Sequence, residues 1–198
     1  MSQVTSFADR VRASLREQLL AATAELLAER GFRGLRMADV AAATGVSRQT
    51  VYNEFGGKDE LVAAVARHKT AEFVDGIAAR LTAAGGLLAG IECAIDYALR
   101  HATEDRLVNS ILTGTDAEDL LPLLTTRALP VLLPLVEQLS AHLLAHRPGL
   151  PPEQALLYAE TGVRLTVSHL LMPTGDPALA ASTITDLMRR LLREDNSS

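Results

Sequence analysis

The side chains best suited to hydrogen-bonding chemistry gather in one short stretch, "TGVSRQTVYNEFGGKDEL", residues 44–61. Within it, Arg48, Gln49, Tyr52 and Asn53 are spaced so that they share one face of a helix. Arginine pairs with guanine in a DNA major groove, and glutamine or asparagine pairs with adenine. The stretch therefore predicts contact with DNA, and an ordinary solvated helix face is the alternative.

Two short helices, expected at about 37–44 and 48–55, must position these side chains. The connection "TGVS" predicts a helix-turn-helix. Gly45 supplies a left-handed turn conformation that other residues resist. Ser47 is a natural N-cap for the second helix, and Val46 is placed to fill the gap between the two helices.

This part of the chain resembles the helix-turn-helix of the TetR-type transcriptional regulators over about residues 12–65. The matching segment is "MADVAAATGVSRQTVYNEFGGKDEL". The resemblance implies a homodimer that binds a palindromic operator and releases it when a small molecule enters the C-terminal domain. With the motif, it implies DNA contacts by Arg36, Ser47, Arg48, Gln49, Thr50, Tyr52, Asn53 and Lys58. Tyr52 and Lys58 would contact phosphate, and Arg48 and Gln49 would read bases.

Two positions depart from the family pattern. Glu54 stands where the family usually has Tyr or His near phosphate, and we expect it to accept from cytosine or to pair with Lys58. Arg36 stands where the family often has a capping Thr, so it loses the cap but could meet phosphate.

Composition bounds the remaining possibilities. The chain has 198 residues, 48% of them hydrophobic, and a net charge of −5. Residues 1–60 carry eight basic and eight acidic residues, so the excess acid lies in the C-terminal part. The single cysteine, Cys93, excludes an internal disulfide and a multi-cysteine metal site. No membrane span or export signal is evident, so we expect a cytoplasmic protein. We expect no cofactor, no metal site and no catalytic residues.

Helical spacing appears almost everywhere and strand alternation nowhere, which predicts an all-α fold of about nine helices. We expect a helix-turn-helix domain at 1–57 and a ligand-binding and dimerisation domain at 58–198. Further helices are expected at about 58–83, 87–103, 105–113, 117–146, 152–171 and 177–194. Pro130 and Pro134 predict either a kink or two helices within 117–146.

The helix expected at 152–171 is apolar on nearly all sides, which favours burial by a partner subunit. A deep core helix in a monomer is the alternative. The candidate interface residues are Gly162, Leu170, Ile184, Leu187, Met188 and Leu191.

The helices between 87 and 139 are rich in Leu and Ile, so a cavity among them would be apolar. We therefore expect a largely hydrophobic effector, of acyl-chain type. The candidate lining residues are Ile91, Ile95, Tyr97, Ile111, Leu132, Val136 and Arg164. Pairing with Glu160 or a partner chain is the alternative for Arg164, and an ordinary core position is the alternative for Tyr97.

These observations favour a ligand-responsive regulator, a repressor, with double-stranded DNA, a small-molecule effector and a second copy of itself as partners, and no membrane. A helical-bundle carrier or enzyme for an apolar ligand is the alternative, although no nucleophile motif or phosphate-binding glycine loop supports an enzyme. A DNA-binding scaffold without ligand response is a third reading.

Overall fold

The computed structural model describes residues 7–113, 129–173 and 175–194, and every element in these ranges is a helix. The fold is all-α, as predicted. Nine helices are described within these ranges: α1 (Phe7–Gly34), α2 (Met37–Thr44), α3 (Arg48–Phe55), α4 (Lys58–Ala83), α5 (Leu87–Glu104), α6 (Arg106–Thr113), α8 (Leu129–His146), α9 (Pro152–Leu171) and α10 (Pro177–Glu194).

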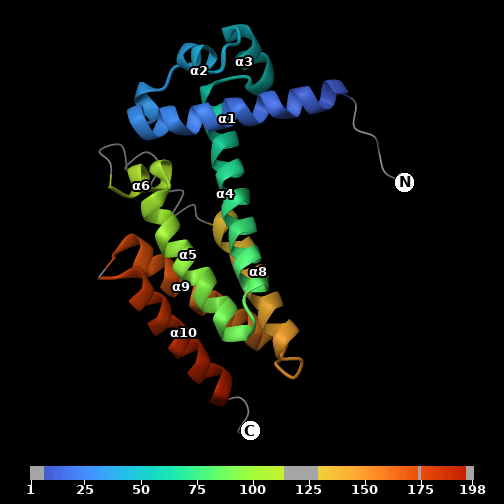
Figure 1. Cartoon of the computed structure of the whole chain (residues 1–198), viewed down its shortest axis with the longest axis vertical. Coiled ribbons are helices and arrows are strands. Elements are labelled where there is room, and N and C mark those ends of the chain that lie inside the picture. The colour runs from blue at the N-terminus through green and yellow to red at the C-terminus, as the bar shows by residue number, and fades with distance from the viewer. Residues whose placement is uncertain (1–6, 114–128, 174, 195–198) are drawn as a thin grey trace.

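Two groups of helices are joined by α4. Helix α1 crosses one end of the molecule with α2 and α3 on its outer side, and α4 runs from them along the bundle of α5, α8, α9 and α10 (Figure 1). The chain thus presents the short helices α2 and α3 at one end, beside α1, and the long helices of the bundle, α5, α8, α9 and α10, at the other. None of the described helices is long and apolar enough to span a membrane.

The N-terminal core is built from α1 to α3, the first half of α4 and part of α6. Leu19, Val40, Val51 and Leu61 are fully buried in it. Helix α1 deviates at Gly31, whose φ of 65° interrupts the regular helix. Leu107 of α6 belongs to the same core, so α6 is attached to the first domain as well as to the second.

Ion pairs strengthen that attachment. Arg106, the first residue of α6, contacts Glu25 of α1 at 2.5 Å and Glu29 at 3.6 Å. All three side chains are largely exposed, so each pair contributes little to stability on its own. Their consequence is geometric, because they hold the start of α6 against α1.

The C-terminal core combines α4, α5, α8, α9 and α10 around side chains such as Ile91, Leu143 and Met188, each at most 1% exposed. Helix α8 is one helix from Leu129 with Pro130 in its first turn and Pro134 in its interior. The predicted segment 117–128 lies outside the described residues, so of the predicted helix 117–146 only its second part can be compared. The other helices with predicted bounds, α2 to α6, α9 and α10, begin and end within one residue of them.

Candidate DNA interface and ligand cavity

Local sequence signals position α3. The Ser47 hydroxyl accepts from the Thr50 amide at 3.1 Å, which is the predicted N-cap. Gly45, at φ 69°, ends α2 in the left-handed conformation that glycine adopts without strain. Val51 and Phe55 are buried and fasten α3 to the N-terminal core, so the opposite face of α3 is turned to solvent.

The exposed face of α3 carries two ordered pairs of polar side chains. Arg48 donates to the Tyr52 hydroxyl at 3.2 Å, with its guanidinium 5.3 Å from the centre of the Tyr52 ring. Gln49 donates to the Asn53 side-chain carbonyl at 2.9 Å. All four are partly or fully exposed. The pairs reduce the freedom of these side chains before any contact with DNA, and they place donors and acceptors side by side along the helix.

Two further predicted contacts flank this face. Lys58 is the first residue of α4, where amide groups of the helix terminus add positive potential, and its ammonium lies 4.4 Å from the centre of the Phe32 ring. Arg36 precedes α2, is exposed and makes no side-chain cap, as the sequence suggested. Both side chains are cations suited to phosphate.

Glu54 does not pair with Lys58, and neither predicted role describes its place in the structure. It turns toward α1, where Arg16 contacts it at 2.7 Å and Arg12 at 3.1 Å. Its side chain is only 15% exposed. Partial burial raises the pKa of Glu54, but hydrogen bonds and charge from Arg16 and Arg12 outweigh that effect and lower it. The acid therefore ties α3 to α1, and its charge is neutralised on the surface that would approach phosphates.

Replacing Glu54 with Gln should lower the free energy of unfolding near neutral pH by about 1 kcal/mol, the scale of a partly buried charge-assisted contact. Because the pKa is lowered in the folded state, the carboxylate stabilises the fold above its ordinary value of 4.5 and loses that effect as the pH falls through the lower, folded-state value. Urea unfolding of wild type and Glu54→Gln should thus differ at pH 7 and converge in acid. The exposed Glu17, changed to Gln, is the control, and an equal difference at all pH values would contradict this assignment.

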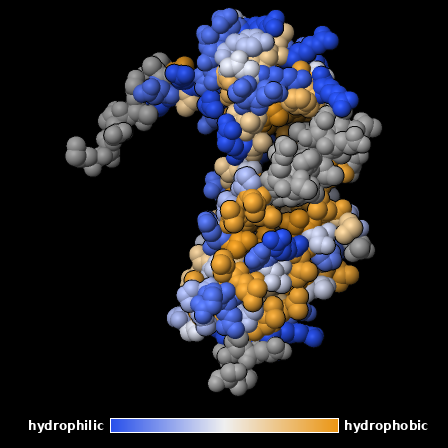
Figure 2. All heavy atoms as spheres, turned by 180° about the vertical axis from the view of Figure 1, so that it is seen from behind, coloured by the Kyte–Doolittle hydropathy of each residue, from blue (hydrophilic) through white to orange (hydrophobic). Residues whose placement is uncertain are grey.

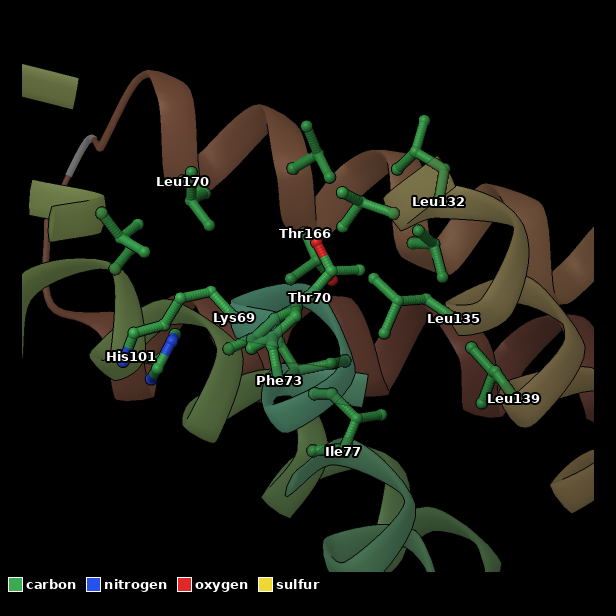
Figure 3. A pocket seen from close by; sticks show the side chains of 18 of the residues that line it. Lys69, Thr70, Phe73, Ile77, His101, Leu132, Leu135, Leu139, Thr166 and Leu170 are labelled. Atoms are coloured by element: carbon green, nitrogen blue, oxygen red, sulfur yellow. The ribbon is translucent and has the colours of Figure 1, made fainter. Parts of the chain in front are cut away.

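A cavity of about 210 Å³ opens between α4, α5, α6, α8 and α9. Its lining is almost entirely apolar, with Phe73 and Ile77 from α4, Ile95 from α5 and Leu135 from α8 (Figure 3). Its lining also includes Leu27 of α1, which belongs to the N-terminal core. A molecule in this cavity would therefore contact both groups of helices.

Four of the seven residues predicted to line a ligand site do line the cavity: Ile91, Ile95, Ile111 and Leu132. Val136 is buried but outside the lining. Arg164 is exposed and pairs with Glu160 at 2.7 Å, the alternative that the sequence left open. Tyr97 lies behind the lining, stacked on Phe73 at 5.9 Å between ring centres.

The cavity also contains residues that pattern reasoning did not single out, above all Lys69, Thr70, Phe73 and Ile77 of α4. Two of these, Phe73 and Ile77, are spaced i, i+4 on one face, which could have indicated a wall facing α5. Lys69 lies one turn before Phe73 and so shares this face, but a lysine is more often exposed to solvent than enclosed in a cavity. His101 of α5, one helical turn after Tyr97, also lines the cavity.

The six residues predicted at a dimer interface divide into two sets. Ile184 and Met188 are at most 2% exposed within a single protomer, and Gly162 is buried against Met188 and Leu139. Leu170 is partly buried and lines the cavity. Only Leu187, at 41% exposed, and the partly buried Leu191 turn toward the outside of the protomer.

Large apolar side chains are exposed on the last two helices. Leu156 and Leu157 of α9 and Leu179 and Leu187 of α10 are all more than 40% exposed. Seen from behind, apolar residues gather over the long helices while the end with α2 and α3 is mainly hydrophilic (Figure 2). An apolar face of this kind is typical of a surface that another molecule covers.

Two family models match the chain. Residues 19–65 match the model described as bacterial regulatory proteins, tetR family, and residues 86–190 match the bacterial tetracyclin repressor C-terminal domain. The chain is 32% identical over 168 residues to the HTH-type transcriptional regulator AlkX of Mycobacterium tuberculosis, covering 84% of this chain and 80% of that one.

Solved structures agree in fold. The crystal structure of the TetR family repressor AlkX from a Dietzia species, implicated in biodegradation of n-alkanes, is 29% identical with a TM-score of 0.66, over 90% of this chain and 95% of that one. The transcriptional regulator FadR from Bacillus subtilis, solved in complex with stearoyl-CoA, is 15% identical with a TM-score of 0.60, over 87% and 96% of the two chains.

Proposed function

Because the chain belongs to the TetR family of transcriptional regulators, we propose that it is a repressor that binds a palindromic operator as a homodimer and is released by a chain-like, apolar small molecule. Such a protein acts in the cytoplasm, where its operator lies. The observation that carries the proposal is the position of the cavity, which borders α1 and α4 of the DNA-binding end as well as the long helices.

The DNA part of the proposal rests on the exposed face of α3. In a helix-turn-helix dimer the second helix lies in the major groove, and the two half-sites are about one helical turn apart. We assign Arg48 and Gln49 to bases and Tyr52, Lys58 and Arg36 to phosphates. The remaining proposed DNA contacts are Ser47 and Thr50, at the N-terminal end of α3, and Asn53. The local acid, Glu54, is neutralised by two arginines and does not oppose phosphate.

The dimer part rests on the exposed leucines of α9 and α10. We propose that a second copy covers Leu156, Leu157, Leu179 and Leu187, and that Leu191 borders the contact. The predicted interface residues that are buried within the protomer would not contact the second copy, but they would pack under the helices that do.

The effector part rests on the lining. A nearly all-apolar cavity that extends past several turns of α4 suits an unbranched hydrocarbon chain. A relative at 29% identity is implicated in biodegradation of n-alkanes, which agrees with a chain-like effector. Filling the cavity would favour an arrangement of α1 and α4 that no longer fits two successive grooves, and DNA would in turn weaken effector binding by the same factor.

One experiment tests the DNA and dimer parts together. Duplexes bound by the purified full chain are selected from a random pool, sequenced, and then bound again while the mass of the complex is measured by light scattering. We expect an inverted repeat and two protomers for each site, or a multiple of two. Enrichment of a single unrepeated site by a monomer would refute the proposal.

Filling the cavity tests the effector part. Ala98 of α5 is 5% exposed and lines the cavity, so Ala98→Phe should occupy space that the effector needs. We expect unchanged operator affinity in fluorescence anisotropy and at least a tenfold higher effector concentration for release. Ala89→Phe, at an exposed position on the same helix, should respond like wild type. Equal release of wild type and Ala98→Phe would place the effector elsewhere.

A further inference from the structure

One end of the apolar cavity is polar. Among its described lining residues, only Lys69, Thr70, His101 and Thr166 carry side-chain nitrogen or oxygen atoms. Lys69 and His101 lie together at one end, while Leu135 and Leu139 lie toward the other (Figure 3). A ligand with a chain and a head could therefore enter in one orientation only, and the polar end determines which head is accepted.

The charge of Lys69 is already compensated. Its ammonium donates to a carboxylate oxygen of Asp105 at 3.1 Å and lies 3.3 Å from one of Glu72. Asp105 is 13% exposed and also accepts from the amides of Leu107 and Val108, so it caps the start of α6. A ligand carboxylate would have to break this partly buried pair, or enter as an additional unpaired negative charge.

Of the four polar lining residues, His101 and Thr70 make no hydrogen bond among those described, and His101 is the one that lies at the polar end beside Lys69 (Figure 3). Its ring stacks on Phe73 at 5.2 Å between ring centres. Burial lowers the pKa of His101, with the nearby charges of Asp105 and Lys69 acting in opposite directions. The neutral ring offers one donor and one acceptor. Among the hydrogen bonds described for the chain, none is made by this ring.

Thr166 is already engaged, unlike His101. Its hydroxyl donates to the carbonyl of Gly162 one helical turn earlier, at 2.9 Å. Its place in the middle of the lining also separates it from the polar end (Figure 3). Thr166 therefore provides an internal comparison for the role of His101.

We propose that the cavity takes an unbranched chain with one small, uncharged oxygen head, of the class of a primary alcohol, and that the head lies against His101 beside Lys69. A hydroxyl can both donate to and accept from the imidazole, and it leaves the Lys69–Asp105 pair intact. A plain hydrocarbon would strip water from His101 and replace it with nothing. This inference rests on the proposed function and specifies its effector.

Three probes of equal chain length test the head group: octane, octanol and octanoic acid, bound to the full-length protein at pH 8 and followed by calorimetry. Without a polar partner, octanol should bind at least about tenfold more weakly than octane, because its hydroxyl loses water. With His101 as partner, we expect octanol to bind as tightly as octane or tighter, and octanoate to bind weakest.

Two variants locate the contact. His101→Phe keeps a ring that can stack on Phe73 but removes both nitrogens, and it should lower the octanol-to-octane affinity ratio by about tenfold. Thr166→Val should leave that ratio unchanged. A wild-type protein that binds octanoate tightest, or octanol far more weakly than octane, would overturn the head-group inference, and so would an unchanged ratio in His101→Phe.

The same series separates this inference from the proposed function. If all three probes bind equally and release DNA, the regulator stands and the head-group inference falls. If none of the three binds or releases DNA, both fall. The wild-type comparison does not depend on a variant that folds, so the inference remains open to refutation even if His101→Phe is unstable.

Discussion

Arg48→Ala should weaken binding to the selected operator by about 2–6 kcal/mol, because each protomer of the proposed dimer loses one bidentate base contact worth about 1–3 kcal/mol. That is roughly thirtyfold to twenty-thousandfold in Kd. Arg48 is exposed and hydrogen bonds only within α3 among the described contacts, to the Tyr52 hydroxyl at 3.2 Å, so its removal should not affect the fold. Anisotropy titration against the operator and against a scrambled duplex gives both affinities.

A variant at a proposed phosphate contact, Lys58, distinguishes the loss of base reading from a general loss of DNA affinity. Lys58→Ala should weaken the operator and the scrambled duplex alike and reduce the slope of log K against log salt by about one per protomer. The exposed Arg67, lower on α4, should tolerate alanine without change. If Arg48→Ala lost affinity equally for both duplexes, it would be a phosphate contact and the assignment of α3 to base reading would need revision.

Gly90→Ala should lower the melting temperature by roughly 4–8 °C, and this is the largest stability effect that we expect from one added methyl group. A Cβ at Gly90 would lie 2.6 Å from the Leu81 carbonyl oxygen and 2.9 Å from Nε2 of His142. His142 is itself held by a 3.2 Å contact to the Leu87 carbonyl, so neither obstacle can move freely. Overpacking lowers the free energy of unfolding by about 1–3 kcal/mol. We expect the upper end of this range, because the nearest atom, the Leu81 carbonyl oxygen, belongs to the backbone.

Alanine favours the helix over glycine by about 1 kcal/mol, which offsets part of the cost of overpacking. The net loss in the free energy of unfolding is therefore about 2 kcal/mol. Gly162→Ala is the matched control, because Gly162 is also a buried helical glycine. Its added Cβ would meet Met188 Sδ at 3.4 Å and a Leu139 methyl at 3.5 Å, which are ordinary contacts. Calorimetric melting should show Gly162→Ala equal to or more stable than wild type. Equal melting temperatures for Gly90→Ala and wild type would show that α4 and α5 can separate at no cost.

The contrast between these glycines shows what pattern reading can and cannot supply. Gly45 was predictable from sequence because its role is local: the chain must turn left-handed between two short helices. Gly90 looks like any helical glycine, and its importance comes from a carbonyl nine residues earlier and a histidine on α8. The helices and the DNA motif were predictable because, like the turn at Gly45, they depend on local signals such as periodicity and capping residues.

The candidate ligand residues divide in the same way. Ile91 and Ile95 were predicted because they are apolar and periodic, and they do line the cavity. Lys69 shares the helical face of Phe73 and Ile77, but its enclosure in the cavity was not predicted, because that depends on a partner 36 residues away at Asp105. Glu54 was recognised as an exception to its family pattern, but its partners on α1 depend on how two distant helices cross. Apolar positions alone could not identify the dimer surface, because the sequence does not show which apolar side chains are already buried within one protomer.

Helix α4 contributes Leu61 and Val65 to one core and Ile77 and Leu81 to the other. Helix α4 continues from one core into the other, and a cut between Gly57 and Lys58 would remove Leu61, Val62, Ala64 and Val65 from the first core. We therefore expect that neither half, divided at that point, folds on its own. A molecule that binds among the long helices would thus change the stability of the helix that supports the DNA-binding end, so the cooperativity that holds the chain together would also carry the signal of the proposed effector.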